Sequence, residues 1–222
     1  MPRYAGEKLP RVSGKLQRKE GLRVALTGDS ISAGANASSK GYPPHEPPYS
    51  VLLAAELEVI YGGRVDLVNV SVGGATADGG FKGIQKVLDA KPDLVIISYG
   101  MNDVAGRNPT HYADTIKAMI SAVRASQPDT EFMLVSTSLA NSEWNWTPAD
   151  QFPKYRDALT GLLGHGMILA DCTALWTDLL ARKRYHDLTG NGVNHPNDFG
   201  HRLYAQVLLS LLVDEKRMQA QH

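Results

Sequence analysis

The sequence predicts an α/β fold in which a parallel sheet of five strands is covered by helices on both faces. Short apolar segments alternate along the chain with longer segments whose apolar residues have helical spacing. Glycine turns follow several of the apolar segments, for example at Gly73-Gly74 and Gly100. No internal repeat or second-domain boundary is evident. Strands that are separated by helices indicate a parallel sheet, and 222 residues suffice for one such domain.

The first half of the chain contains three predicted strands and two predicted helices. Residues 23–26 form an apolar run that ends in a glycine turn, and residues 49–61 place leucine and isoleucine at helical spacing. A strand is predicted over residues 65–72, because its apolar residues lead to a pair of glycines. Residues 81–88 predict a short helix, and residues 94–98 predict a strong, fully apolar strand before a further glycine.

The second half repeats the alternation. A helix over residues 112–125 stops before a proline, and apolar runs predict strands over residues 132–136 and 167–170. A polar loop over residues 185–198 precedes the last helix. The remaining helices are predicted from their apolar spacing over residues 152–163, 175–183 and 199–213.

The chain is predicted to divide into a short N-terminal segment and one domain. Residues 1–21 mix charged residues with glycine and proline, which is typical of an arm or a linker remnant. Residues 22–222 contain all the predicted strands and helices, and we expect them to form a single domain.

The composition excludes some classes of function. Lys plus Arg number 23 and Asp plus Glu also number 23, so there is no electrostatic reason to expect a nucleic acid or an anionic membrane as partner. No apolar run approaches the length of a membrane span, and the N-terminus lacks the apolar centre of a signal peptide. We therefore expect a cytoplasmic protein, or an exported one whose signal is absent. The single cysteine, Cys172, follows an apolar run and is predicted to be buried and inert.

Polar residues follow the first and third predicted strands, where sites of parallel sheets are built. Ser30 comes directly after the first strand in Gly28-Asp29-Ser30, so its hydroxyl can point into the crevice; alternatively it caps a helix. Asn102 follows the third strand, and its side-chain amide is suited to hold a developing oxyanion. A turn asparagine is the simpler interpretation of Asn102 taken alone.

Two further clusters contribute a backbone amide and a base. Gly74 follows the second strand, where a glycine lets the backbone N–H approach a ligand without obstruction. His195 lies just before the last helix, far from Ser30 in the sequence, and the fold can bring both to one edge of the sheet. Each cluster alone has a structural alternative, a flexible turn or a loop histidine, but their combination in this order is specific.

Together the four clusters resemble the SGNH hydrolases, also called GDSL esterases and lipases. The matching blocks are Gly28-Asp29-Ser30, Gly74 after Asn69, Gly100-x-Asn102-Asp103 and His195-Pro196. The resemblance implies a flavodoxin-like three-layer α/β/α sandwich and a serine esterase that needs no metal or other cofactor. It also implies Ser30 as nucleophile, His195 as general base, and an oxyanion hole formed by the N–H groups of Ser30 and Gly74 with the Asn102 side chain.

One departure from the family pattern concerns the triad acid. The family usually has an aspartate three residues before the histidine, and here that position is Gly192. Asn191 takes its place if one residue is inserted. A backbone carbonyl near Gly192, or Asp187 from earlier in the loop, is another partner for the Nδ1–H group of His195. An amide side chain can present its NH₂ and select the wrong tautomer, so we favour the carbonyl or Asp187 over Asn191.

The loop after the fourth strand suggests a substrate. Trp144 and Trp146 at a strand's carboxyl end can form a platform for a sugar ring, or else pack against the domain. No long apolar lid segment is evident, which argues against long acyl chains. The SGNH hydrolases include carbohydrate acetyl esterases, so the resemblance and this loop together imply short acetyl esters of carbohydrates as substrates. The expected partner is thus a small-molecule or glycan ester, and the sequence does not indicate the oligomeric state.

Three other functions fit the sequence less well. The first is a general short-chain esterase, lysophospholipase or thioesterase of the same fold. The second is a catalytically degenerate carbohydrate-binding domain, which the missing acid suggests and the retained serine, asparagine and histidine oppose. The third is a metallohydrolase, but the spacing of the candidate ligands matches no strong metal motif. Those candidates are His186, His195, His201, Asp187 and Asp198.

Overall fold

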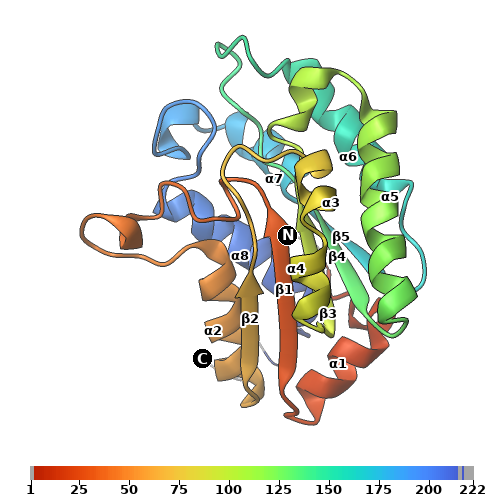
Figure 1. Cartoon of the computed structure of the whole chain (residues 1–222). Helices are drawn as coiled ribbons and strands as arrows, with labels where there is room; N and C mark the ends of the chain where they lie inside the picture. The colour runs from red at the N-terminus through yellow and green to blue at the C-terminus, as the bar shows by residue number, and fades with distance from the viewer. Residues whose placement is uncertain (1–2, 215–216, 218–222) are drawn as a thin grey trace.

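Five parallel strands form the central layer of the computed structural model, which describes residues 3–214 and residue 217 (Figure 1). The strand order across the sheet is β2-β1-β3-β4-β5. β3 and β4 are buried along their whole lengths, whereas the edge strands β2 and β5 are partly accessible. The strands are β1 Leu22–Gly28, β2 Val65–Asn69, β3 Leu94–Ser98, β4 Glu131–Ser136 and β5 Met167–Asp171.

Helices cover both faces of the sheet. α2 packs against α8 on one face, and α3, α4, α5 and α6 form the layer on the other face (Figure 1). The α-helices are α1 Pro10–Gln17, α2 Tyr49–Tyr61, α3 Ala77–Lys82, α4 Gln85–Asp89, α5 Pro109–Ser126, α6 Phe152–Thr160, α7 Cys172–Leu180 and α8 Asp198–Leu212. Short 3₁₀ helices are η1 Gly6–Lys8, η2 Ser38–Lys40, η3 Asp103–Gly106, η4 Ala149–Gln151 and η5 Tyr185–Asp187. The predicted three-layer α/β/α sandwich is therefore confirmed.

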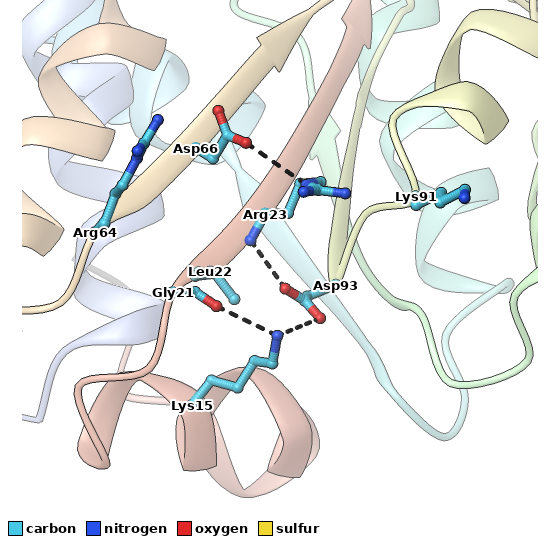
Figure 2. Close-up of a pocket in the computed structure, with 8 residues that line it drawn as sticks. All are labelled: Lys15, Gly21, Leu22, Arg23, Arg64, Asp66, Lys91 and Asp93. Atoms are coloured by element: carbon cyan, nitrogen blue, oxygen red, sulfur yellow. Dashed lines mark hydrogen bonds and ion pairs between the residues drawn. The ribbon is translucent and has the colours of Figure 1, made fainter.

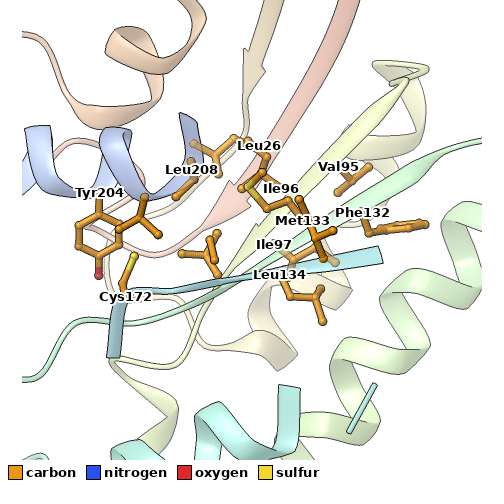
Figure 3. Packing of buried hydrophobic residues seen from close by; sticks show 14 of the residues in the cluster. Leu26, Val95, Ile96, Ile97, Phe132, Met133, Leu134, Cys172, Tyr204 and Leu208 are labelled. Atoms are coloured by element: carbon orange, nitrogen blue, oxygen red, sulfur yellow. The ribbon is translucent and has the colours of Figure 1, made fainter. Parts of the chain in front are cut away.

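The core lies between the sheet and these helices. Apolar side chains of the central strands pack against Leu208 and Tyr204 of α8 (Figure 3). The predicted burial of Cys172 is confirmed, and burial raises the pKa of its thiol well above the usual range. Trp176 of α7 packs against Tyr204, so α7 joins the layer of α8. None of the helices in residues 3–214 is long and apolar enough to cross a bilayer.

Two elements differ from the prediction, one because a polar side chain ends it and one because a glycine interrupts it. The predicted strand over residues 65–72 ends at Asn69, whose Oδ1 accepts a hydrogen bond from the Ser71 N–H at 3.0 Å and turns the chain. The predicted helix over residues 81–88 is instead two short helices, α3 and α4. The break between α3 and α4 includes Gly83, which has the high conformational freedom that weakens a helix.

The N-terminal segment departs from the predicted arm over residues 1–21. Residues 10–17 form α1, and Leu9, Val12 and Leu16 are buried in the same core as the sheet. Glu131, at the start of β4, accepts hydrogen bonds from two backbone N–H groups in the first turn of α1, at 2.8 and 3.1 Å. Pro10 and Gly14, two of the residues that suggested a linker, lie at the start of this helix and within it. Proline is well tolerated in a first helical turn.

Residues 1–2, 215–216 and 218–222 belong to the predicted arm and domain but lie outside the described residues. Within the described part, the segment before β1 packs on the predicted domain from Ala5 onward, since the Ala5 N–H donates to the Leu211 carbonyl at 2.9 Å.

We predict that Leu9→Ala lowers the free energy of unfolding by about 2–5 kcal/mol, because it removes a fully buried side chain and leaves a cavity. Urea unfolding followed by circular dichroism measures the change. Lys8→Ala at the neighbouring exposed position is the control, and we expect it to change stability by at most about 0.5 kcal/mol. Equal stability of the two variants would show that the segment is an arm after all.

Candidate active site

The carboxyl ends of β1 and β3 form the switch point of this strand order, where parallel sheets of this type place their ligands. Ser30 follows β1 directly, in a turn that requires glycine before it. A Cβ on Gly28 would collide with the Ser32 hydroxyl and the Ser98 carbonyl. The Oγ atom of Ser30 lies 2.9 Å from Nε2 of His195, although the two residues are 165 positions apart. A serine hydroxyl at this distance can pass its proton to a neutral imidazole.

His195 lies on a loop that α8 and the chain before it hold in place. Residues Thr189 and Pro196 pair as an antiparallel bridge, and the Gly190 N–H donates to the His195 carbonyl at 2.9 Å. Asn197 caps α8 by accepting from the Gly200 N–H at 3.0 Å. The helix cap and the bridge fix the backbone on both sides of the histidine.

The imidazole has two amide neighbours on its Nδ1 side. Asn36 Oδ1 lies 3.2 Å from Nδ1, and Asn191 Nδ2 lies 3.1 Å from it. Burial lowers the pKa of His195 below its ordinary value. Among the described residues no carboxylate is hydrogen-bonded to this ring, so no carboxylate opposes the effect of burial.

Of the three predicted partners of His195, only one contacts the imidazole ring. Asp187 bonds to the backbone N–H and guanidinium of Arg184, at 3.1 and 3.3 Å, rather than to His195. The Gly192 carbonyl accepts from the Asn141 side chain at 2.9 Å. Asn191, which we ranked below the other two, does contact the ring, and it presents its NH₂ group as expected of an amide.

The predicted oxyanion donors Gly74 and Asn102 follow β2 and β3, the two neighbours of β1 in the sheet. Gly73 lies against Ser30, since a Cβ built on Gly73 would be 4.0 Å from the Ser30 Cβ. Gly74 has a φ of +76°, a conformation that favours glycine, and nothing lies within 4 Å of where its Cβ would be. Over residues 3–214, the N–H groups of Ser30 and Gly74 have no hydrogen-bond partner in the protein. Asn102 Nδ2 donates one of its two hydrogens to the Ala75 carbonyl at 2.9 Å, which keeps the amide beside Gly74.

Hydrogen bonds of polar side chains connect the three strand ends. Asp103 accepts from the Gly100 N–H at 3.0 Å and from the Ala77 N–H at 2.8 Å, which joins the end of β3 to the start of α3. Asn69 donates to the Ser32 carbonyl at 2.8 Å, which joins β2 to the serine turn. Asp29 accepts from the Ile31 N–H at 2.9 Å within that turn. These residues support the site without facing the reacting atoms.

Burial also perturbs both of these carboxyl groups. It raises the pKa of Asp29 to about 7 and that of Asp103 to about 6, while hydrogen bonds from backbone N–H groups act in the opposite direction. The two groups also interact with each other, because a negative charge on Asp103 raises the pKa of Asp29.

The loop that carries Trp144 and Trp146 is hydrogen-bonded to the loop that carries His195. Asn141 donates through its backbone N–H to the Val193 carbonyl at 2.8 Å, and through its side chain to Gly192. Trp144 packs partly against the core, whereas Trp146 is 64% exposed. Of the two predicted platform residues, only Trp146 therefore presents most of its surface to solvent.

The structure has two hollows of interest, and only one of them adjoins this site. A cavity of about 220 Å³ adjoins Asn102 and is lined by polar groups that include Asp78, His111 and Tyr155. A larger hollow of about 610 Å³ lies at the amino ends of the strands, between Lys15, Arg23, Asp66 and Asp93 (Figure 2). It is at the end of the sheet opposite to Ser30, and it does not belong to the site. Residues 3–214 contain no group of three or more His, Cys, Asp or Glu side chains arranged to hold a metal ion.

The sequence prediction missed Asn36, and it named His201 only as a candidate metal ligand. His201 is fully buried, and its Nε2 lies 3.0 Å from the Ala35 carbonyl, so it holds the segment that carries Asn36. The only signal for Asn36 was an asparagine shortly after Gly34 on the serine's own loop. Asp198, the first residue of α8, accepts from the Ser38 N–H at 2.8 Å and secures the same segment.

Comparison with solved structures shows the same fold in esterases. A two-domain esterase active on acetylated mannans superposes with a TM-score of 0.74 at 22% identity, over 95% of this chain and 53% of that one. A catalytic mutant of Axe2, an acetylxylan esterase from Geobacillus stearothermophilus, superposes with a TM-score of 0.70 at 18% identity, over 87% of this chain and 95% of that one.

Sequence comparison gives a short match and a long one. An uncharacterized lipoprotein, YqeF of Bacillus subtilis (strain 168), is 34% identical over 83 residues, which are 37% of this chain and 32% of that protein. The chain thus spans about a third of the lipoprotein and about half of the mannan esterase. The model of the GDSL-like lipase/acylhydrolase family matches residues 26–203, a range that contains Ser30, Gly74, Asn102 and His195. The chain therefore belongs to the GDSL-like lipase/acylhydrolase family.

Proposed function

We propose that this protein hydrolyses carboxylic esters through an acyl-enzyme, with Ser30 as nucleophile and His195 as general base. The observation that supports this most directly is the 2.9 Å contact between Ser30 Oγ and His195 Nε2 at the switch point of the sheet. The ring is held neutral near pH 7 by its burial, so Nε2 is available to accept a proton.

The reaction proceeds in two steps, acylation of Ser30 and hydrolysis of the acyl-enzyme. As Ser30 Oγ attacks the ester carbonyl carbon, its proton passes to His195 Nε2 and the carbonyl electron pair moves onto oxygen. When the tetrahedral intermediate collapses, the alcohol oxygen leaves and takes the proton from His195. Water then attacks the acyl-enzyme with the same base, and this releases the carboxylic acid and restores the serine.

The developing oxyanion is stabilised by donors that are in place before reaction. We assign this role to the N–H groups of Ser30 and Gly74 and to the second hydrogen of Asn102 Nδ2. Because the Ala75 carbonyl and the Asp103 network hold these groups, they need little reorganisation during catalysis.

We further propose acetyl groups on carbohydrates as the substrates. The similar structures include esterases named for acetylated mannans and for acetylxylan. The exposed Trp146 is on a loop joined to the histidine loop, where an indole can stack on the C–H face of a sugar ring. A short-chain esterase of broader specificity is the alternative on the same catalytic machinery.

We predict that Ser30→Ala abolishes turnover of acetylated xylan and mannan oligosaccharides while the protein stays folded. The reason is that the acyl-enzyme cannot form without Oγ. Acetate release by the wild type and the variant measures this, and unchanged thermal unfolding checks the fold.

The same assay run with medium-chain acyl esters tests the substrate class. A higher kcat/KM on acetylated oligosaccharides supports the carbohydrate assignment, and a higher value on medium-chain esters contradicts it. Acetate release that persists in Ser30→Ala would refute the nucleophile.

A pH profile of kcat/KM provides a second test. The active base is neutral His195, and burial lowers its pKa, so the neutral form persists to lower pH than for a free imidazole. We therefore expect the acid limb of the profile, where the ring gains a proton, to be centred below the pKa of a free imidazole. A fall that is centred above pH 7 would mean that an anionic group stabilises the protonated ring.

A further inference from the structure

We infer that Asn36 positions His195 by accepting a hydrogen bond from its Nδ1–H group, and that Asn191 competes for the same nitrogen with its NH₂ group. The inference deepens the proposed function, since it names what takes the place of the triad acid. It rests on contacts of His195 Nδ1 with Asn36 Oδ1 at 3.2 Å and with Asn191 Nδ2 at 3.1 Å.

The orientation of the Asn191 amide is fixed by its other contacts. Its Oδ1 accepts from the backbone N–H groups of Val193, Asn194 and His195 at 3.0 to 3.1 Å. Reversing the amide would place NH₂ against three donors. The Nδ2 atom of Asn191 must therefore face His195, with Asn194 Oδ1 as its second partner at 3.0 Å.

The orientation of the Asn36 amide follows from that of Asn191. Nδ1 of a neutral imidazole is either a donor or an acceptor with one lone pair. If Asn36 also presented NH₂, two donors would compete for that single lone pair. With Oδ1 toward the ring, Asn36 gives the Nδ1–H group its only acceptor among the described residues.

Each amide therefore stabilises a different tautomer. With a proton on Nδ1, the ring donates to Asn36 and leaves Nε2 free to accept the Ser30 proton. With Nδ1 bare, the ring accepts from Asn191 and carries its proton on Nε2, where it cannot act as the base. Asn36 supports the reactive tautomer, and it continues to accept from Nδ1–H when the ring becomes an imidazolium.

The protein holds Asn36 from three sides. Its φ of +63° is a left-handed conformation that asparagine tolerates better than most residues. His201 bonds to the carbonyl of the preceding residue, and Asp198 bonds to Ser38 two positions later. Gly190 packs against the side chain so closely that a Cβ there would lie 2.8 Å from the Asn36 Cβ. This amount of support is expected of a positioning residue.

The test uses ¹⁵N NMR of the histidine rings in the full-length chain, since the nitrogen shifts report which ring atom carries the proton without any ester turnover. His195→Gln identifies the His195 signals among the seven histidines. Asn36→Gly removes the acceptor and keeps the left-handed backbone free of strain. Lys91→Gly, at an exposed left-handed position (φ 47°), is the matched control.

We expect the proton on Nδ1 in the wild type and in Lys91→Gly, and on Nε2 in Asn36→Gly. In the ester assay, Asn36→Gly then loses about 10²- to 10⁴-fold in kcat with little change in KM, the upper end being the cost of a wrong tautomer in a serine triad. Asn36→Asp, which keeps an acceptor and adds a charge, restores Nδ1–H and moves the acid limb of the pH profile upward.

A wild-type ring protonated on Nε2, or a tautomer that Asn36→Gly leaves unchanged, would overturn the inference. If instead the tautomer changes as expected but the wild type hydrolyses no ester, the positioning role stands and the proposed function fails. The two failures are therefore distinguishable.

Discussion

The contact between Ser30 and His195 is the constraint that organises this molecule. It joins residues at opposite ends of the chain, and each depends on a different part of the fold. Ser30 depends on β1, which lies inside the sheet between β2 and β3. His195 depends on the start of α8, which packs beside α2 on one face. In a sheet with parallel strands and helical connections, strand ends and helix starts lie at the same edge, so the topology brings Ser30 and His195 together.

The loops at this edge are connected to one another by hydrogen bonds of polar side chains. Asp103 spans from β3 to α3, and Asn69 spans from β2 to the serine turn. Burying the Asp29 and Asp103 carboxyl groups disfavours their charged forms, which is why both pKa values are raised. Hydrogen bonds from backbone N–H groups offset part of this cost. In the proposed mechanism, these hydrogen bonds fix the oxyanion donors before any substrate arrives.

Much of the fold could be predicted because strands and helices of an α/β sandwich have distinct apolar periods. The helix over residues 49–61 and the strand over residues 94–98 match α2 and β3 in both bounds. The N-terminal segment could not be assigned, because α1 is short and contains a glycine and a proline. Its stability comes from Glu131, which is distant in sequence, and from burial of three apolar side chains.

The candidate site, like the fold, could be predicted only in part. Ser30, Gly74, Asn102 and His195 could be proposed from residues that follow strands or precede a helix, and the structure brings Ser30 and His195 into contact. Of the two amides that face His195 Nδ1, Asn191 was among the predicted alternatives. Asn36 could not be derived, because it belongs to a loop whose course is set by His201 and Asp198. A search limited to the residues just before the histidine does not reach it.

The most direct measurement of the central claim is labelling with a fluorophosphonate, followed by intact-mass analysis and peptide mapping. An unactivated serine does not react with this probe, so the experiment tests nucleophile and base together. The account predicts a single adduct on Ser30 that is lost in His195→Ala. An adduct on another residue, no adduct at all, or labelling of Ser30 that does not depend on His195 would contradict it.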